Sequence, residues 1–254
     1  MRVAIMALTM LAATALPAAA QSRLDEIITR GTLRVGLTGD YKPFSSLDKE
    51  TGKYSGLDVD MAELLAKALG VKLEIVPTAW AKLLPDVTEG KFDVGMGGIS
   101  INLDRAKVAF FSTPVMRTGK TPIARCENKD KFTALSDIDK PGVKVITNPG
   151  GTNERYDRAN LHNAEIVVFP DNSRIFDELV AGHADLMITD SVETRLQQKL
   201  HPELCAIHPD APFDFGELGY LLPRDVPLQQ YVDIFLHTQA ETGAYQRLVA
   251  AWLQ

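Results

Sequence analysis

Hydrophobic positions along the chain alternate between short apolar runs and longer stretches with helical spacing. After residues 54–56, Val59, Leu64, Leu65 and Leu69 recur at helical spacing, and Gly70 provides a C-terminal stop. The short runs predicted to form strands are residues 33–37, 71–76, 92–95, 143–146, 165–169 and 184–188. Strands that alternate with helices in this way indicate an α/β protein with parallel sheets.

The alternation occurs twice, which predicts two α/β halves. Further helices are expected over residues 22–30, 80–87, from 154, through 176–180, after 190, and over 228–238 and 243–253. An extended link around residues 119–125 and a return strand near 218–222 should connect the halves as a two-strand hinge. The predicted lobes are residues 21–119 with 217–254, and residues 120–216. Ligands of open α/β sheets bind outside the carboxyl ends of strands, so we expect the site in the cleft between the lobes.

The first twenty residues have the pattern of a secretory signal peptide. Arg2 precedes an almost wholly apolar run, Pro17 breaks it, and residues 18–20 are the small residues that a signal peptidase requires. A membrane anchor is the alternative, but the run is short for a spanning helix of about 20 residues. We therefore expect a soluble mature protein in the periplasm, without membrane association after cleavage.

Composition limits the classes of partner. The 254 residues are 45% hydrophobic and 24% charged, which is enough apolar material for two lobes with cores of their own. The formal net charge is −6, and removal of Arg2 with the leader would make it −7. An acidic protein of this kind does not favour nucleic acid or an anionic membrane as partner.

Two cysteines lie in the exported part of the chain, Cys126 and Cys205. An oxidising compartment favours a disulfide between them, and two buried free thiols are the alternative. A metal site built from Cys205, His201 and His208 is a weaker interpretation, because it lacks a fourth ligand.

Several motifs resemble the amino-acid-binding proteins of ABC transporters. They are residues 54–60 (YSGLDVD), 91–94 (KFDV), 97–100 (GGIS), Arg105 and 110–114 (FFSTP). The resemblance covers nearly the whole mature chain. It implies a periplasmic-binding-protein-like type II fold, in which two lobes close on a small molecule that carries a carboxylate.

A finer set of motifs resembles the periplasmic cyclohexadienyl dehydratases, which share that fold. It comprises residues 39–45 (GDYKPFS), 98–102 (GISIN), 119–123 (GKTPI), 148–154 (NPGGTNE), 189–193 (TDSVE) and 201–205 (HPELC). Asn102 stands where transport proteins usually have Thr. The resemblance implies conversion of prephenate to phenylpyruvate, or of arogenate to phenylalanine, with loss of water and carbon dioxide. It also implies that no metal or organic cofactor is needed, and a homo-oligomer such as a trimer.

Glu193 is the candidate general acid. Asp190 and Glu193 are three residues apart at a helix start, so their side chains share a face. A second carboxylate and a dry cleft both raise the pKa of a carboxyl group, while the helix N-terminus favours the anion. The alternative is a capping box, with Asp190 as N-cap and Glu193 at the third helical position. In amino-acid-binding relatives the residue at position 190 pairs with the ligand's ammonium, and here Asp190 is assigned to bind the amino group of arogenate or, with prephenate, to act indirectly.

The other candidates would bind and orient the substrate. Arg105 should hold a carboxylate through its two-pronged guanidinium, unless it is a solvated helix-face residue. Thr152 and Asn153 open a helix after two glycines, where backbone N–H groups bind anions; we assign Asn153 to orient Glu193 or the leaving hydroxyl, with simple N-capping as the alternative.

Four further residues are assigned to the cleft. Lys120 would contact the ring carboxylate, or else is an exposed strand lysine. Trp80 would form an apolar wall for the ring, with core packing as its alternative. Asp40 and Ser100 are cleft groups, or else cap loops.

Two other functions remain open on the sequence. A transport protein that delivers an amino acid would have the same fold but would need no proton donor at position 193. A periplasmic sensor would normally be fused to a membrane segment.

Overall fold

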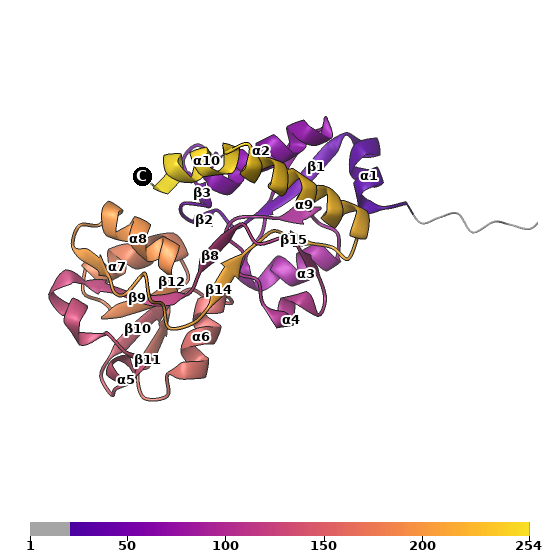
Figure 1. Ribbon diagram of the computed structural model, residues 1–254. Helices are drawn as coiled ribbons and strands as arrows, with labels where there is room; N and C mark the ends of the chain where they lie inside the picture. Colours follow the sequence, from indigo (N-terminus) through magenta and orange to yellow (C-terminus); the bar gives the residue numbers. More distant parts are fainter. Residues whose placement is uncertain (1–20, 254) are drawn as a thin grey trace, which may run out of the picture.

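The structure is a computed structural model that describes residues 21–253. It has two lobes, each built around a five-stranded sheet and joined by a pair of extended segments (Figure 1). The predicted signal peptide lies outside the described residues. Within residues 21–253, no helix has both the length and the apolar character needed to cross a membrane.

The first lobe contains the N-terminal part of the described chain, as far as the strand β8 (Met116–Thr118), and its C-terminal end. Its sheet has the order β5 (Lys72–Pro77), β1 (Thr32–Leu37), β6 (Val94–Gly95), β15 (Leu221–Leu222) and β7 (Phe110–Phe111). Its helices are α1 (Arg23–Arg30), α2 (Leu57–Leu69), α3 (Leu83–Thr88), α4 (Leu103–Ala106), α9 (Val226–Glu241) and α10 (Ala244–Leu253). As predicted, β1 pairs in parallel with β5 and β6, and Gly70 ends α2 in the left-handed conformation at φ 70°.

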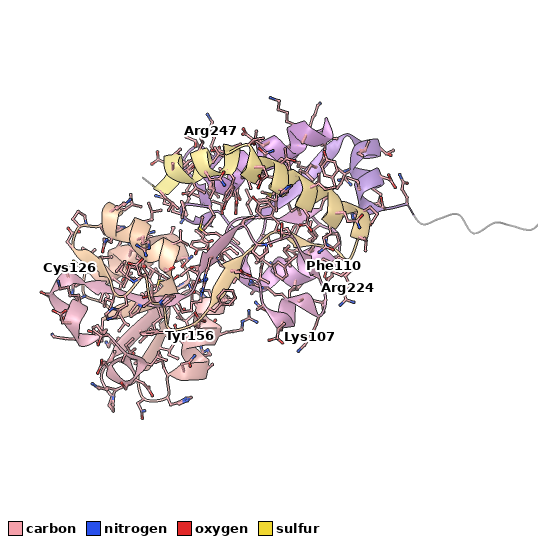
Figure 2. The ribbon with its side chains drawn as sticks, viewed as in Figure 1. Lys107, Phe110, Cys126, Tyr156, Arg224 and Arg247 are labelled. Carbon is pink, nitrogen blue, oxygen red and sulfur yellow. A yellow bond between two sulfur atoms is a disulfide. The ribbon has the colours of Figure 1, made fainter. Side chains whose placement is uncertain are left out.

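The second lobe repeats the architecture with residues from the middle of the chain. Its sheet has the order β11 (Glu165–Val168), β10 (Lys144–Thr147), β12 (Leu186–Asp190), β9 (Lys120–Arg125) and β13 (Leu204–Ala206). Its helices are α5 (Leu135–Ile138), α6 (Thr152–Asn160), α7 (Ile175–Val180) and α8 (Ser191–Leu200). Buried apolar side chains form the core of each lobe (Figure 2). Strands that are covered on both faces need apolar residues at every position, which explains the short continuous hydrophobic runs in the sequence.

The connection between the lobes is the antiparallel pair β8 (Met116–Thr118) and β14 (Gly216–Leu218). The predicted link at residues 119–125 is wrong, because residues 120–125 form β9, an inner strand of the second sheet. The predicted return strand is also misplaced, because Leu221–Leu222 is β15 in the first sheet. A hinge strand and a sheet strand are both extended, so local sequence does not separate them. The lobe boundaries at 119/120 and 216/217 stay a prediction.

A small sheet at the inner edge of the first lobe faces the second lobe. It consists of β2 (Asp40–Tyr41), β3 (Ser45–Leu47) and β4 (Tyr54–Ser55). Between α2 and β6, the buried carboxylate of Asp58 accepts bonds from the backbone N–H groups of Gly97 and Gly98 at 2.8 and 2.9 Å. Gly98 has φ 74°, and a Cβ there would come within 2.6 Å of the rings of Tyr41 and Phe44, so the close approach requires glycine.

The C-terminal helices pack on the first lobe, as predicted. The indole N–H of Trp252 donates to Asp60 at 2.7 Å and fastens α10 to α2. The end of α10 also reaches the second lobe, where the ammonium of Lys199 donates to the Leu253 carbonyl at 2.6 Å (Figure 1).

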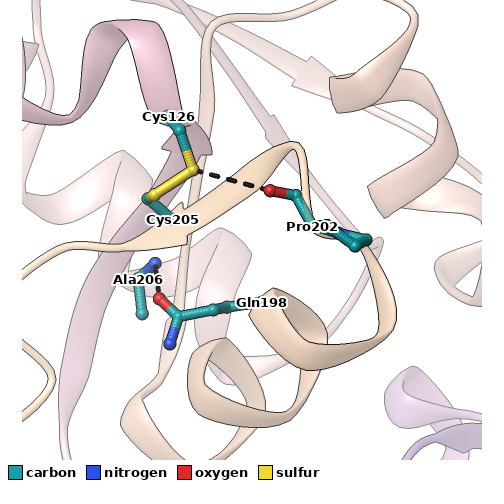
Figure 3. The surroundings of a disulfide bond; sticks show 5 residues. All are labelled: Cys126, Gln198, Pro202, Cys205 and Ala206. Carbon is teal, nitrogen blue, oxygen red and sulfur yellow. Dashed lines mark hydrogen bonds between the residues drawn. A yellow bond between two sulfur atoms is a disulfide. The ribbon is translucent and has the colours of Figure 1, made fainter.

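Cys126 and Cys205 form a disulfide in the second lobe, as predicted, with their Cα atoms 4.8 Å apart (Figure 3). The bond joins the short helix η2 (Cys126–Lys131) to β13. Close by, the Gln198 side-chain carbonyl accepts from the Ala206 N–H at 3.0 Å and fastens α8 to β13. The metal interpretation of Cys205 is therefore wrong, because its sulfur is already bonded to Cys126.

Candidate functional site

A small cavity, here called the inner cavity, lies between the two lobes. Its walls include the predicted residues Trp80, Ser100, Thr152, Asn153, Asp190 and Glu193. Strand β12 ends at Asp190, and α8 begins immediately after it. The side chains at the start of α8 therefore reach the cleft at the carboxyl end of a strand, as the α/β rule predicts.

Glu193 is buried against the inner cavity, with 2% of its surface exposed. The hydroxyl of Thr189 donates to its carboxylate at 2.5 Å. Burial first, and then the neighbouring charge of Asp190, raise the pKa of Glu193, while the Thr189 bond and Lys120 act in the opposite direction; the net pKa is about 8. A carboxyl group with this pKa favours its protonated form at neutral pH.

Asp190 does not cap the helix with its side chain. It occupies the N-cap position of α8 without a side-chain cap bond, so the capping-box interpretation is wrong. Its two oxygens instead accept from the Lys120 ammonium at 2.9 Å and from the Tyr41 hydroxyl at 2.8 Å. Tertiary partners from two other elements have displaced the local interaction.

Lys120 is buried, so the interpretation as an exposed strand lysine is wrong. Its ammonium donates to Asp190, to the Thr152 hydroxyl at 3.2 Å, and to the side-chain carbonyl of Asn153. These three acceptors use the three N–H groups of the ammonium. A buried cation held in this way balances Asp190 and fixes the first turn of α6.

Asn153 connects Lys120 to Glu193 through Thr189. Its amide donates to Thr189 at 3.0 Å and to Asn148 at 3.2 Å, and Thr189 in turn donates to Glu193. The N-cap of α6 is Gly151, so N-capping by Thr152 or Asn153 is not observed. The amide therefore sets the direction in which the Thr189 hydroxyl points.

Arg105 is buried beneath the cleft, which excludes the solvated-surface interpretation. It donates to the Ser100 carbonyl at 2.8 Å, and burial lowers its pKa to about 10. Arg105 does not line the inner cavity. The Ser100 hydroxyl lies 3.1 Å from that of Thr152 across the cleft. Because Arg105 binds the backbone of Ser100, it helps to position this contact between the two lobes.

Trp80 and Asp40 act as a pair. The indole N–H donates to the Asp40 carboxylate at 3.0 Å, and the ring meets Tyr41 edge-on with centroids 5.8 Å apart. Trp80 also packs against core residues of the first lobe, as the core-packing alternative predicted. It lines the inner cavity as well, and its role as a wall for a substrate ring stays a prediction. Asp40 lies outside the inner cavity and orients the ring that forms its wall.

Besides two glycines, sequence reasoning missed three residues of the inner cavity, Tyr41, Asn148 and Asn172. Tyr41 and Asn148 lie inside the motifs that carry the resemblance, which was the signal available. Asn172 lies just before the helix expected through residues 176–180 and outside those motifs. Its amide donates to the Asp40 carbonyl at 3.0 Å, across the lobes.

Cross-lobe bonds hold the cleft closed. Tyr41 with Asp190, Ser100 with Thr152, and the ion pair of Lys49 with Asp171 at 2.7 Å all join the first lobe to the second. The inner cavity has a volume of about 20 Å³, and a water molecule needs ~10–15 Å³ on this measure, so the cavity has room for about one water. The lobes must therefore separate to admit a ring-bearing ligand.

Comparison with known proteins identifies this architecture. The family model for bacterial extracellular solute-binding proteins, family 3, matches residues 33–254. The chain belongs to this family. A cyclohexadienyl dehydratase of Pseudomonas aeruginosa is 53% identical over 99% of the chain and 93% of that relative. The L-cystine-binding protein TcyJ of Escherichia coli is 28% identical over 90% of the chain and 85% of its own length.

Solved structures of related proteins include both binding proteins and enzymes. An ancestral amino-acid-binding protein, described as a precursor of cyclohexadienyl dehydratase, is 40% identical with a TM-score of 0.85 over 92% of the chain and 100% of its own. An ancestral cyclohexadienyl dehydratase is 49% identical with a TM-score of 0.59 over 93% of the chain and 98% of its own. The fold thus serves binding and catalysis, and the site chemistry must distinguish them.

Proposed function

We propose that this protein is a cyclohexadienyl dehydratase, which converts prephenate to phenylpyruvate and arogenate to phenylalanine. The observation that carries the proposal is the buried Glu193 carboxyl group at the wall of the inner cavity, where burial raises its pKa to about 8. The 53% identity with a cyclohexadienyl dehydratase over nearly the full chain supports it.

In the proposed reaction, Glu193 is the general acid. The ring carboxylate leaves as carbon dioxide, and its bonding electrons complete the aromatic ring. The ring hydroxyl departs with the Glu193 proton as water, so the carboxyl group becomes a carboxylate. The substrate is a dianion, and its charge near Glu193 raises the pKa of the acid further and keeps the proton in place until transfer.

The surrounding residues are proposed to hold the acid and the substrate. Asn153 orients Thr189, and Thr189 fixes the Glu193 carboxyl group. Lys120 and Arg105 provide the positive charge for the two substrate carboxylates, with Arg105 reached once the Ser100–Thr152 contact opens. Trp80 forms one wall of the cavity for the ring. No step of this reaction calls for a metal or an organic cofactor.

A transport protein for amino acids is the alternative function. Binding proteins of this family need an acceptor for the ligand ammonium, and Asp190 is the residue assigned to it. Each oxygen of Asp190 accepts one bond here, from Tyr41 or from Lys120, and has capacity for another. Asp190 therefore fits the ammonium of arogenate as well as that of a transported amino acid and does not distinguish the two functions. Transport gives no reason to bury a carboxyl group at position 193, because an uncompensated buried acid costs stability.

We further propose export through a cleaved signal peptide and a periplasmic location. Membership of an extracellular solute-binding family supports this, and so does the disulfide, which persists in oxidising compartments. A homo-oligomer such as a trimer remains a proposal from the resemblance alone. Small carboxylate-bearing molecules, rather than nucleic acid or membrane, are the proposed partners.

Turnover of prephenate tests the proposal directly. The mature chain, mixed with prephenate at neutral pH, should produce phenylpyruvate with many turnovers per molecule. The product is measured by its absorbance after samples are made alkaline. Retention of an unchanged amino acid, measured by calorimetry, with no phenylpyruvate formed would instead establish the transport function.

The pH dependence of kcat/KM should report the acid of the free enzyme. Glu193 must carry its proton, and its pKa is raised to about 8. We therefore expect kcat/KM to be constant below that pH and to fall as pH rises through it, with a slope of one proton. The fall in kcat should come at higher pH, because the bound dianion raises the pKa of Glu193 further. A kcat/KM that increases through this range would show that the essential group works as a base.

A further inference from the structure

A second cavity adjoins Glu193. This outer cavity has a volume of about 410 Å³ and is lined by Asp40, Ser46, Arg174, Glu193, Gln197 and His201, among others. Several of its other wall residues, including Lys42 and Ser173, are exposed, so the cavity opens to solvent. Glu193 therefore forms part of the wall of both cavities, with substrate chemistry on one side and solvent on the other.

One face of α8 runs along the outer cavity. Glu193, Gln197 and His201 follow each other at intervals of four residues, which places them on the same side of a helix. At ~1.5 Å per residue, Glu193 and His201 are separated by ~12 Å along the axis. At ~30 Å³ per water molecule, the outer cavity has room for about a dozen waters, enough to span that distance.

His201 is held in place at the far end of this face. It is the C-cap residue of α8, and its ring stacks on Phe176 with centroids 6.2 Å apart. The following turn is fastened by the disulfide at Cys205 (Figure 3). These contacts give His201 a fixed position at the wall of the outer cavity. Stacking on Phe176 uses only the face of its ring.

The proposed reaction creates a demand for protons. Each turnover transfers one proton from Glu193 to the departing hydroxyl and leaves a buried carboxylate. In the closed form, cross-lobe bonds cover the substrate side of the inner cavity, so a proton that returns before the lobes separate needs another route. Before the next turnover, one proton must come from solvent to that carboxylate.

We propose that the outer cavity is the path by which solvent protons return to Glu193, and that His201 is the proton carrier at its outer end. This inference rests on the proposed function. The imidazolium of His201 gives its proton through a chain of water to the Glu193 carboxylate and takes another from solvent or buffer acid. Histidine suits the task because its side chain exchanges a proton near neutral pH.

Other charged groups along the cavity are less suited to carry protons. Asp40 accepts the Trp80 N–H, and Lys49 is paired with Asp171. Lys42 and Arg174 also line the cavity, but their ammonium and guanidinium groups are hydrogen-bond donors without an acceptor atom, so they cannot take a proton from water and pass it on. Gln197 cannot gain or lose a proton in this range, and it borders the water path between Glu193 and His201.

The test measures proton uptake directly in His201→Gln. The mature protein and excess prephenate are mixed in a stopped-flow instrument, in weak buffer with an indicator dye, while product absorbance is followed in parallel. We expect the first turnover to be as fast as in the parent, and proton uptake and later turnovers to be slowed several-fold. Added imidazole should restore both rates, because a small acid can enter the outer cavity.

Two further variants complete the experiment. Ser46→Phe narrows the outer cavity from the opposite lobe and should slow proton uptake without rescue by imidazole. His183→Gln is the matched control, since His183 is an exposed histidine away from the outer cavity and should behave as the parent. Proton uptake at the parental rate in both His201→Gln and Ser46→Phe would overturn the inference. Failure of the proposed function would look different, because the parent itself would form no phenylpyruvate.

Discussion

Glu193→Gln should lower kcat for prephenate by about 100-fold or more, the usual scale for loss of a general acid. The glutamine amide has nearly the same shape and can still accept from Thr189, but it has no acidic proton for the departing hydroxyl. Substrate binding should persist, because the groups proposed to hold the carboxylates are unchanged. The measurement is steady-state turnover together with calorimetric titration of prephenate into the variant.

The control for this substitution is Glu203→Gln, which removes an exposed carboxylate from the same lobe. It should leave kcat unchanged. If Glu193→Gln turned over prephenate within a few-fold of the parental rate, Glu193 would not be the general acid. If the variant lost both binding and turnover, the residue would have a structural role.

Glu193→Gln should also be more stable than the parent, and the difference in stability should depend on pH. The pKa of Glu193 is raised from 4.5 to about 8 in the folded protein. Below pH 4.5 both the folded and the unfolded chain hold the proton, so ionisation of Glu193 does not change the free energy of unfolding. Between the two values the unfolded chain releases its proton while the native protein does not, so the parent loses stability as pH rises. The advantage of Glu193→Gln in Tm should therefore widen from pH 5 to pH 8.

Replacement of both cysteines, Cys126→Ser with Cys205→Ser, should lower the free energy of unfolding by about 2–5 kcal/mol. The disulfide joins residues 79 apart in sequence, so its loss releases a long loop in the unfolded chain. Urea unfolding of the double variant against the parent measures the change. Reduced parent protein is the control and should unfold at the same urea concentration as the variant.

The position of the disulfide gives this substitution a second consequence. It lies at the far end of α8 from Glu193, beside the turn that carries His201 (Figure 3). We expect the first turnover of the double variant to keep the parental rate. An unchanged free energy of unfolding would show that the bond contributes nothing to the stability of the second lobe.

Local pattern in the sequence was sufficient for most of the secondary structure. The spacing of apolar residues predicted α2 and its end at Gly70, and the short apolar runs predicted the parallel strands of both sheets. These elements follow from periodicity, because a side chain's direction along a helix or strand depends only on its place in the repeat. The resemblance carried by short motifs then pointed to the two-lobed fold and to the region around position 193.

Tertiary structure decided what those residues do. The segment at 189–193 fits a helix cap as well as an acid site, and only Lys120 and Tyr41, brought from other elements, show that Asp190 is not the cap. The hinge was misplaced by a few residues because extended backbone has the same local pattern in a hinge and in a sheet. The pKa of Glu193 depends on desolvation by both lobes, and burial by residues far apart in sequence leaves no trace in local spacing.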